Sequence, residues 1–241
     1  MKSKEQPRLR MFAGPNGSGK STIKANLKPE LVGIYVNADE IEREIQENGF
    51  YDFSAYPFKI DASELTEHIQ NSALLKENNI LVSFNLKNNQ FYHNKNTINS
   101  YIAAVLSAFL RKRILQEKLS FSFETVMSFP DKVTLLQTAK ELGYKTYLYF
   151  VATESPLINI ARVAYRVKMG GHSVSDNKIT TRYYKSLDLL INAIHLSDRA
   201  YIFDNSGDNK IWLAEITNGT NMELKTDNVP KWFATYVLNK I

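Results

Sequence analysis

Glycine residues near the N-terminus recur at a spacing that suits the binding of phosphate groups. The apolar run at residues 9–13 opens into the stretch Gly14-Pro15-Asn16-Gly17-Ser18-Gly19-Lys20-Ser21-Thr22. This stretch satisfies the pattern G-x-x-x-x-G-K-[ST], in which backbone N–H groups converge on phosphate oxygens. Side chains at the glycine positions would obstruct that approach. Residues 14–22 are therefore predicted to form a phosphate-binding loop.

The polar residues at the end of this loop have separate predicted roles. Lys20 would neutralise the β- and γ-phosphates of a nucleoside triphosphate, and the Ser21 hydroxyl would ligate Mg²⁺. A helix that begins near Gly19 would also point the positive end of its dipole at the anion. The motif therefore predicts a nucleoside triphosphate and Mg²⁺ as cofactors.

The composition excludes several classes of site. The 241 residues contain no cysteine, so neither disulfides nor thiolate metal sites can form. The longest apolar candidate for a membrane span, residues 102–110, stops at Arg111-Lys112-Arg113, and a cytoplasmic protein without a membrane partner is expected. The formal net charge of +5 suits an anionic partner, but it does not choose between a nucleotide and a nucleic acid.

The elements that must position the loop follow from the apolar pattern. Buried strands are predicted at residues 9–13, 33–37, 119–123, 146–152 and 200–203, with an antiparallel edge strand at 211–216. Helices are predicted at residues 21–27, from 38 onward, 61–76, 97–119, 131–142, from 156 onward, 176–197 and 229–241. With the loop motif, this alternation predicts a P-loop NTPase fold of class α/β, a three-layer α/β/α arrangement with a mainly parallel sheet of about five strands.

The chain is predicted to be one domain over residues 1–241. Its composition is 44% apolar, which is enough to bury a sizeable core. Residues 50–118 are interpreted as a mostly helical insertion carried on the core sheet. Within them, residues 78–96 are rich in Asn and Lys and are interpreted as an irregular surface excursion.

Carboxylates follow two of the predicted strands. Asp39 comes after the strand at 33–37, and Glu124 and Thr125 follow the strand at 119–123. Ligands of open parallel sheets bind at the carboxyl ends of the strands, so these residues are candidates for binding substrate. Asp39 could instead be a carboxylate at a helix start, and Glu124 could be a buried side chain bonded to the backbone.

Three arginines supply positive charge beyond the loop. Arg162 and Arg166 lie four residues apart on one side of a predicted helix, and Arg182 lies on the next helix. Guanidinium groups on a closing lid are a usual means of stabilising the charge in phosphoryl transfer, although the same spacing is typical of an exposed helix face. Between the helices lies Gly170-Gly171-His172, where His172 would either contact substrate or cap the turn.

Five further segments follow the phosphate-binding loop in order: Val36-Asn37-Ala38-Asp39-Glu40-Ile41, Phe123-Glu124-Thr125, Arg162-Val163 with Arg166-Val167, Gly170-Gly171-His172-Ser173-Val174 and Ile179-Thr180-Thr181-Arg182-Tyr183. In this combination they resemble the zeta toxin family of bacterial toxin–antitoxin systems. The resemblance extends from Met11 to Asn205 and does not include residues 78–96.

The resemblance implies a kinase that transfers the γ-phosphate of ATP to a sugar hydroxyl of UDP-N-acetylglucosamine. It implies that Asp39 contacts the substrate and accepts its hydroxyl proton, and that Glu124 and Thr125 bind the sugar. Lys20, Arg166 and Arg182 are then the catalytic cations, while Arg162 joins residues 14–22 in binding the nucleotide. The implied partners are a nucleotide sugar and an antitoxin protein.

One residue departs from the family pattern. Many relatives have a second threonine directly after the position of Thr125, where this chain has Val126. Valine cannot donate a hydrogen bond to substrate, so the acceptor is less well defined than the kinase chemistry. Two alternatives stay open: a kinase of a nucleic-acid 5′-hydroxyl or another metabolite, and a non-catalytic switch that ATP orders for a protein partner.

Overall fold

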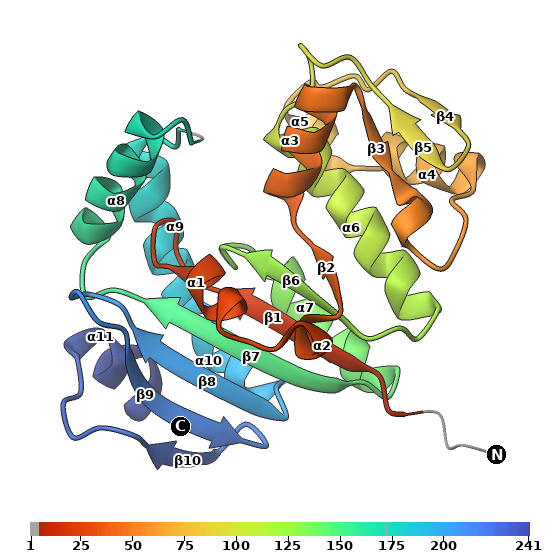
Figure 1. The fold of residues 1–241 in the computed structure, drawn as a ribbon. Helices are drawn as coiled ribbons and strands as arrows, with labels where there is room; N and C mark the ends of the chain where they lie inside the picture. The colour runs from red at the N-terminus through yellow and green to blue at the C-terminus, as the bar shows by residue number, and fades with distance from the viewer. Residues whose placement is uncertain (1–4, 172) are drawn as a thin grey trace. The chain divides into compact units, whose positions relative to one another are not determined.

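The computed structural model describes residues 5–171 and 173–241, and their contacts divide into two compact units. The first unit comprises the chain up to Tyr35 together with Lys118–Ile241, and the second comprises Val36–Glu117. Each unit has its own sheet and its own helices (Figure 1). The predicted insertion covered residues 50–118, whereas the second unit covers Val36–Glu117 and so also contains α3 (Ala38–Asn48). That the two units make one domain stays a prediction.

A seven-stranded sheet forms the centre of the first unit, in the order β10-β9-β8-β7-β1-β6-β2. Strands β6, β1, β7 and β8 run parallel, whereas β9 and β10 are antiparallel. The strands are β1 (Arg8–Ala13), β2 (Ile34–Val36), β6 (Phe121–Thr125), β7 (Lys145–Ala152), β8 (Arg199–Asp204), β9 (Ile211–Thr217) and β10 (Asn221–Leu224). The mainly parallel sheet is therefore confirmed, and β10 is a strand that the sequence did not predict.

Successive side chains of the central strands point to opposite faces of this sheet, and apolar side chains cover both faces. On one face Phe12, Tyr149 and Tyr201 are in register, with ring centroids 5.2 Å and 4.9 Å apart. On the other face Met11 and Leu148 are in register and fully buried. Parallel strands covered on both faces need apolar side chains in both directions, which accounts for the near-continuous apolar runs.

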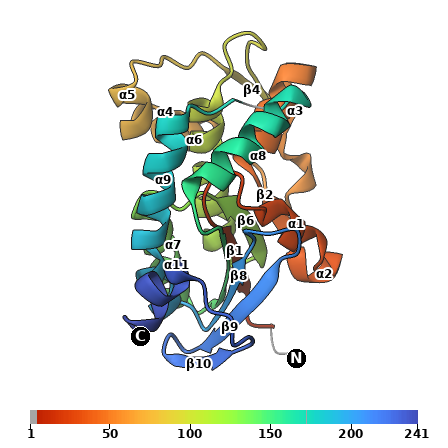
Figure 2. The same ribbon diagram turned by 90° about the vertical axis from the view of Figure 1, so that its left-hand side faces the viewer.

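Helices cover both faces of the sheet in the first unit, with α1 and α2 in front of it and α7 and α10 behind it in the view of Figure 1. Their bounds are α1 (Lys20–Ala25), α2 (Pro29–Val32), α7 (Asp131–Glu141), α8 (Pro156–Lys168), α9 (Asp176–Asp188), α10 (Leu190–His195) and α11 (Lys231–Phe233), the last continuing as a π-turn over Ala234–Leu238. Figure 2 shows α8 and α9 side by side, consistent with their direct packing. None of the described helices is both long and apolar enough to cross a membrane.

Two helix predictions in the first unit need correction. The helix predicted at 176–197 is two helices, α9 and α10, with Leu189 between them. The helix predicted at 21–27 ends at Ala25 as α1, and Pro29 begins the short helix α2, because proline lacks the N–H that the first helical position leaves unbonded. In the C-terminal segment, where a helix is predicted at 229–241, Trp232, Phe233 and Val237 are buried, whereas Tyr236 is only partly buried.

The second unit is a small sheet with four helices. Its elements are α3 (Ala38–Asn48), β3 (Phe50–Asp52), a 3₁₀ turn (Phe53–Ala55), α4 (Ala62–Gln70), α5 (Ala73–Glu77), β4 (Asn85–Lys87), β5 (Gln90–Tyr92) and α6 (Ser100–Gln116). The helix predicted at 61–76 is divided, because the Ser72 hydroxyl accepts a hydrogen bond from Leu75 N (3.3 Å) and starts a new helix.

The predicted surface excursion at 78–96 contains a hairpin. Strands β4 and β5 are joined by Asn88 and Asn89, whose φ angles of 52° and 60° are both left-handed. Asparagine tolerates this region, and two such residues make the tight turn that matches the twist of paired strands. The run of Asn and Lys that indicated irregular structure is therefore partly turn chemistry.

Candidate nucleotide-binding site

The predicted phosphate-binding loop, residues 14–22, runs from the end of β1 into α1, and two of its glycines are required by close neighbours. Gly14 has φ +141°, and a Cβ atom there would lie 2.0 Å from the carbonyl oxygen of Val151. Gly19 has φ +96°, and its Cβ would lie 2.4 Å from Nδ2 of Asn205. Any larger residue would move β7 or the loop after β8, so the glycine spacing also packs the loop against its own sheet.

Lys20, Ser21 and Glu124 form one polar cluster at the end of this loop. The Ser21 hydroxyl donates to Oε2 of Glu124 (3.0 Å), and Nζ of Lys20 lies 3.9 Å from the other carboxylate oxygen. Lys20 also donates to the carbonyl of Pro15 (3.0 Å) and is buried. The Tyr35 hydroxyl donates to Oε2 of Glu124 (3.2 Å).

The sheet register brings Glu124 to the loop. Strand β6 pairs with β1 in parallel, and Glu124 is the partner of Phe12, two residues before Gly14. Parallel neighbours end at the same edge, so the carboxyl end of β6 meets the loop that follows β1. Glu124 is only partly buried, and its bonds are to the Ser21, Lys20 and Tyr35 side chains. The structure therefore differs from the alternative of a buried, backbone-bonded glutamate.

Two asparagines that the sequence did not single out hold the loop in place. Nδ2 of Asn205 donates to the carbonyl of Ser18 (2.7 Å), and Nδ2 of Asn159 donates to the carbonyl of Asn16. Asn159 is fully buried, and its side-chain oxygen accepts a hydrogen bond from Thr153. They come from the segment after β8 and from α8, so only the fold brings them to the loop.

The turn after β8 is itself fixed by buried hydrogen bonds. The Asp204 carboxylate accepts from the Ser206 hydroxyl (2.8 Å) and from Nε1 of Trp232 (2.7 Å). The Ser206 hydroxyl in turn accepts from the backbone N–H of Glu154 (2.8 Å). Asp204 is buried, and it satisfies these donors at the same edge of the sheet.

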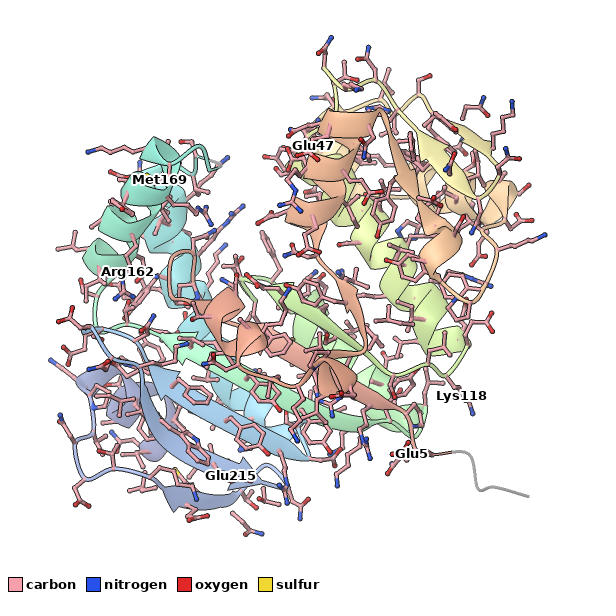
Figure 3. The ribbon with its side chains drawn as sticks, viewed as in Figure 1. Glu5, Glu47, Lys118, Arg162, Met169 and Glu215 are labelled. Atoms are coloured by element: carbon pink, nitrogen blue, oxygen red, sulfur yellow. The ribbon has the colours of Figure 1, made fainter. Side chains whose placement is uncertain are left out.

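Arg162 lies on α8 and is directed at this turn. Its two terminal nitrogens donate to the carbonyls of Asn205 (2.6 Å) and Gly207 (3.3 Å). Figure 3 labels Arg162 on the part of α8 nearer the sheet, with Met169 at the far end of the helix. The guanidinium therefore braces the segment that contacts the phosphate-binding loop, a support that its sequence position did not reveal.

The other two arginines lie on neighbouring helices. Arg166 is exposed on α8, and Arg182 is partly buried on α9. Within the described residues Arg182 makes no hydrogen bond or ion pair through its side chain. The two helices pack on each other, so both arginines are carried by one helical pair of the first unit.

Gly170 and Gly171 end α8 in a Schellman motif. Gly170 has φ +88° and donates to the carbonyl of Val167 (3.0 Å), and Gly171 donates to that of Arg166 (3.0 Å). These are the two bonds that satisfy the last carbonyls of a helix when a left-handed residue follows it. The predicted break is thus a helix cap, while His172 lies outside the described residues.

Asp39 lies in the second unit, on the first turn of α3. Its backbone N–H is capped by the Asn37 side chain (2.9 Å), and its own side chain is exposed. Within the described residues its carboxylate accepts no hydrogen bond and makes no ion pair. This carboxylate is therefore a first-turn residue whose oxygens are accessible to a ligand.

Thr125 and Val126 follow Glu124 at the end of β6. The Thr125 hydroxyl accepts a hydrogen bond from the backbone N–H of Met127 (3.0 Å), and both Thr125 and Val126 are partly buried. Met127 has φ +54°, so the chain turns sharply here. The hydroxyl next to Val126 is therefore engaged in shaping its own turn.

The loop contains polar atoms suited to a bound anion and cation. The Ser18 hydroxyl is buried and, among the described residues, has no hydrogen-bond partner. An unsatisfied buried donor is costly, and a phosphate oxygen would accept from it. Ser21 and Glu124 together present hydroxyl and carboxylate oxygens, the ligand types that Mg²⁺ takes. No cluster of three or more His, Cys, Asp or Glu side chains able to hold a metal occurs in the described part of the chain.

No protein-family model matches this chain. An uncharacterised protein of Haemophilus influenzae is 30% identical over 69 residues, which are 29% of this chain and 49% of that protein. The match thus spans about half of that relative.

Solved structures share the fold over most of the chain. The AvrRxo1-ORF1:AvrRxo1-ORF2 complex with sulphate ions gives a TM-score of 0.55 at 13% identity, covering 92% of this chain and 62% of that one. The same pair with ATP gives 0.52 at 13% identity, covering 91% and 61%. The PezAT chromosomal toxin–antitoxin system of Streptococcus pneumoniae gives 0.53 at 14% identity, covering 100% and 82%. The chain therefore shares the α/β fold of the AvrRxo1 and PezAT structures, and this confirms the fold that the sequence motifs predict.

Proposed function

We propose that this protein is an ATP-dependent kinase of the zeta-toxin type. The observation that carries the proposal is the cluster of Lys20, Ser21 and Glu124 at the predicted phosphate-binding loop, on a fold shared with the structure from the PezAT toxin–antitoxin system. Phosphoryl transfer needs positioning and charge stabilisation more than covalent chemistry, and a loop of this kind supplies both. ATP is the proposed donor, supported by the neighbour whose structure holds ATP.

Mg²⁺ is the proposed metal, held by Ser21 and Glu124. The pair is a hydroxyl and a carboxylate 3.0 Å apart, which fits a hard cation that keeps several waters and binds few protein groups. When bound, Mg²⁺ neutralises charge on the phosphate oxygens. Lys20 supplies the matching charge from the protein, and Tyr35 orients the glutamate through its hydroxyl.

Asp39 is the proposed general base. In the transfer, a bond forms between the acceptor oxygen and the γ-phosphorus, the bond from that phosphorus to the β–γ bridging oxygen breaks, and ADP leaves. The acceptor proton passes to the Asp39 carboxylate, whose accessible oxygens support this role. Arg166 and Arg182 are the proposed groups that stabilise the charge on the equatorial phosphoryl oxygens.

The proposed acceptor is a hydroxyl of a UDP-activated sugar such as UDP-N-acetylglucosamine. The resemblance at Phe123-Glu124-Thr125 supports it, and Val126 is the observation that favours a different acceptor. A nucleic-acid 5′-hydroxyl or another metabolite is therefore the second candidate. A non-catalytic switch is the third, and it requires Asp39 to be dispensable. An antitoxin is the proposed partner, because the PezAT neighbour belongs to a toxin–antitoxin system.

One experiment separates these functions. Purified protein with ATP and Mg²⁺ is offered nucleotide sugars, free sugars and oligonucleotides with 5′-hydroxyls, and ADP release is measured for each. The proposal expects ADP release that depends on a nucleotide sugar, with phosphate found on its sugar. Release that depends only on oligonucleotides favours the second candidate, and tight ATP binding without release for any acceptor favours the switch.

A further inference from the structure

Lys210 is a second lysine at the phosphate-binding loop, and it comes from the segment between β8 and β9. Its Nζ donates to Oγ1 of Thr22 (2.7 Å), the last residue of the loop motif. The Thr22 hydroxyl in turn donates to the carbonyl of Gly19 (2.6 Å). An ammonium group is thereby held beside the loop, 188 residues away in sequence from the threonine it contacts.

Lys210 makes no ion pair with any residue that the structure describes. It is partly buried, and burial lowers the pKa of its ammonium group. No carboxylate lies within ion-pairing distance of it among residues 5–171 and 173–241. Holding a cation in such a place is unfavourable unless an anion completes it.

The segment that carries Lys210 is held rigidly against the loop. Asn205 donates to the carbonyl of Ser18 (2.7 Å), and its Nδ2 would lie 2.4 Å from a Cβ atom on Gly19. Arg162 braces the carbonyls of Asn205 and Gly207 from α8. The chain just before Lys210 is therefore bonded both to the loop, through Asn205, and to α8, through Arg162.

Of the three phosphates of ATP, two already have proposed binding groups, and this indicates which one Lys210 binds. The β- and γ-phosphates are served by Lys20 and by the metal at Ser21. Lys210 contacts Thr22, one residue beyond Ser21, on the side where the turn after β8 borders the loop. We propose that Lys210 binds the α-phosphate of the nucleotide, with Arg162 and Asn205 positioning its segment. This inference rests on the proposed nucleotide site and adds a residue to it.

The test compares nucleotide binding by four variants in the full chain, measured by calorimetry with ATP and with ADP. Lys210→Met removes the charge and the donor, whereas Lys210→Gln keeps a donor for Thr22 without the charge. Lys210→Arg keeps the charge, and Lys231→Met removes an exposed lysine elsewhere in the first unit. Melting temperatures are measured for all of them.

If Lys210 binds the α-phosphate, Lys210→Met and Lys210→Gln should each lower the affinities for ATP and for ADP by the same factor, roughly ten-fold or more. Lys210→Arg should keep most of the wild-type affinity for both nucleotides, and Lys231→Met should leave both affinities unchanged. Full affinity in Lys210→Gln would make the lysine a latch to Thr22 and overturn the inference. A loss of affinity for ATP with none for ADP would assign Lys210 to the γ-phosphate, which would also overturn the inference. If the wild-type protein binds neither nucleotide, the proposed function itself fails.

Discussion

The phosphate-binding loop and the first turn of α3 are built in opposite ways. Around the loop, four side chains from three other segments of the first unit are bonded to it: Asn159 from α8, Glu124 from β6, and Asn205 and Lys210 from the segment between β8 and β9. At the first turn of α3, the Asp39 side chain is exposed and, within the described residues, unbonded. The loop is thus held by side chains of the protein itself, whereas the described residues leave the Asp39 carboxylate accessible to a ligand.

This difference suits the chemistry proposed for each. A triphosphate carries several charges, and fixed donors bind it without the cost of ordering them at the moment of binding. A general base must instead meet a proton on the substrate, so a carboxylate already bonded to the protein would lose basicity. We therefore expect substitutions at the loop to act on nucleotide binding and substitutions at Asp39 to act on turnover.

The largest effect is expected for Lys20→Ala. This change removes the cation assigned to the β- and γ-phosphates, so ATP turnover should fall to background while the melting temperature changes little. Lys28→Ala, an exposed lysine eight residues further on, is the matched control and should turn over ATP normally. If purified Lys20→Ala turned over ATP at the wild-type rate, the proposed nucleotide-binding site at this loop would be wrong.

Asp39→Asn should leave ATP affinity nearly unchanged and lower the transfer rate by about 100-fold or more, the usual scale for a positioned base. Glu47→Gln, at the other end of the same helix, is the control for a lost carboxylate and should be silent. ATP affinity and single-turnover transfer are measured side by side. A collapse of ATP binding in Asp39→Asn would make the residue part of the nucleotide site and end the contrast between the two regions.

Glu124→Gln distinguishes a metal-binding role from a sugar-binding one. Glutamine can still accept from Ser21 and Tyr35, but it lacks the charge, so the apparent Mg²⁺ affinity should drop by roughly 10- to 100-fold. The measurement is ATP binding as a function of Mg²⁺ concentration. Tyr35→Phe removes one hydrogen bond to the glutamate but leaves its charge, so the apparent Mg²⁺ affinity should fall less than in Glu124→Gln. A raised KM for the sugar with unchanged Mg²⁺ dependence would return Glu124 to the acceptor side.

The smallest effect is expected for Val126→Thr. If UDP-N-acetylglucosamine is the acceptor, restoring the hydroxyl should raise kcat/KM by the value of one neutral hydrogen bond, about 0.5–1.5 kcal/mol or roughly two- to ten-fold. If the pocket suits another acceptor, a buried hydroxyl without a partner should cost about 1–3 kcal/mol. The sign of the change in kcat/KM, with the melting temperature held as a check, decides between them.

The motifs could be predicted from the sequence because each depends on the backbone geometry of a few consecutive residues. The glycines of the loop, the strand before it and the helix after it follow from backbone geometry over a few residues. The same holds for the apolar runs of β1 and β7 and for the glycines that end α8. Where local signals competed, the prediction was wrong: Ser72 divides a helix through its cap, and Asn88 with Asn89 turns an apparent loop into a hairpin.

The sequence by itself determined the glycine-rich loop at residues 14–22 between a strand and a helix, the mainly parallel sheet, and the positions of Asp39 after β2 and of Glu124 at the end of β6. Only the tertiary structure decided which distant side chains complete the loop. Asn159, Asn205 and Lys210 lie far from it in sequence and belong to no spacing motif, yet strand order and register bring them within hydrogen-bonding distance. A motif records what consecutive residues must do for a ligand, whereas contacts between segments depend on where the sheet places their ends.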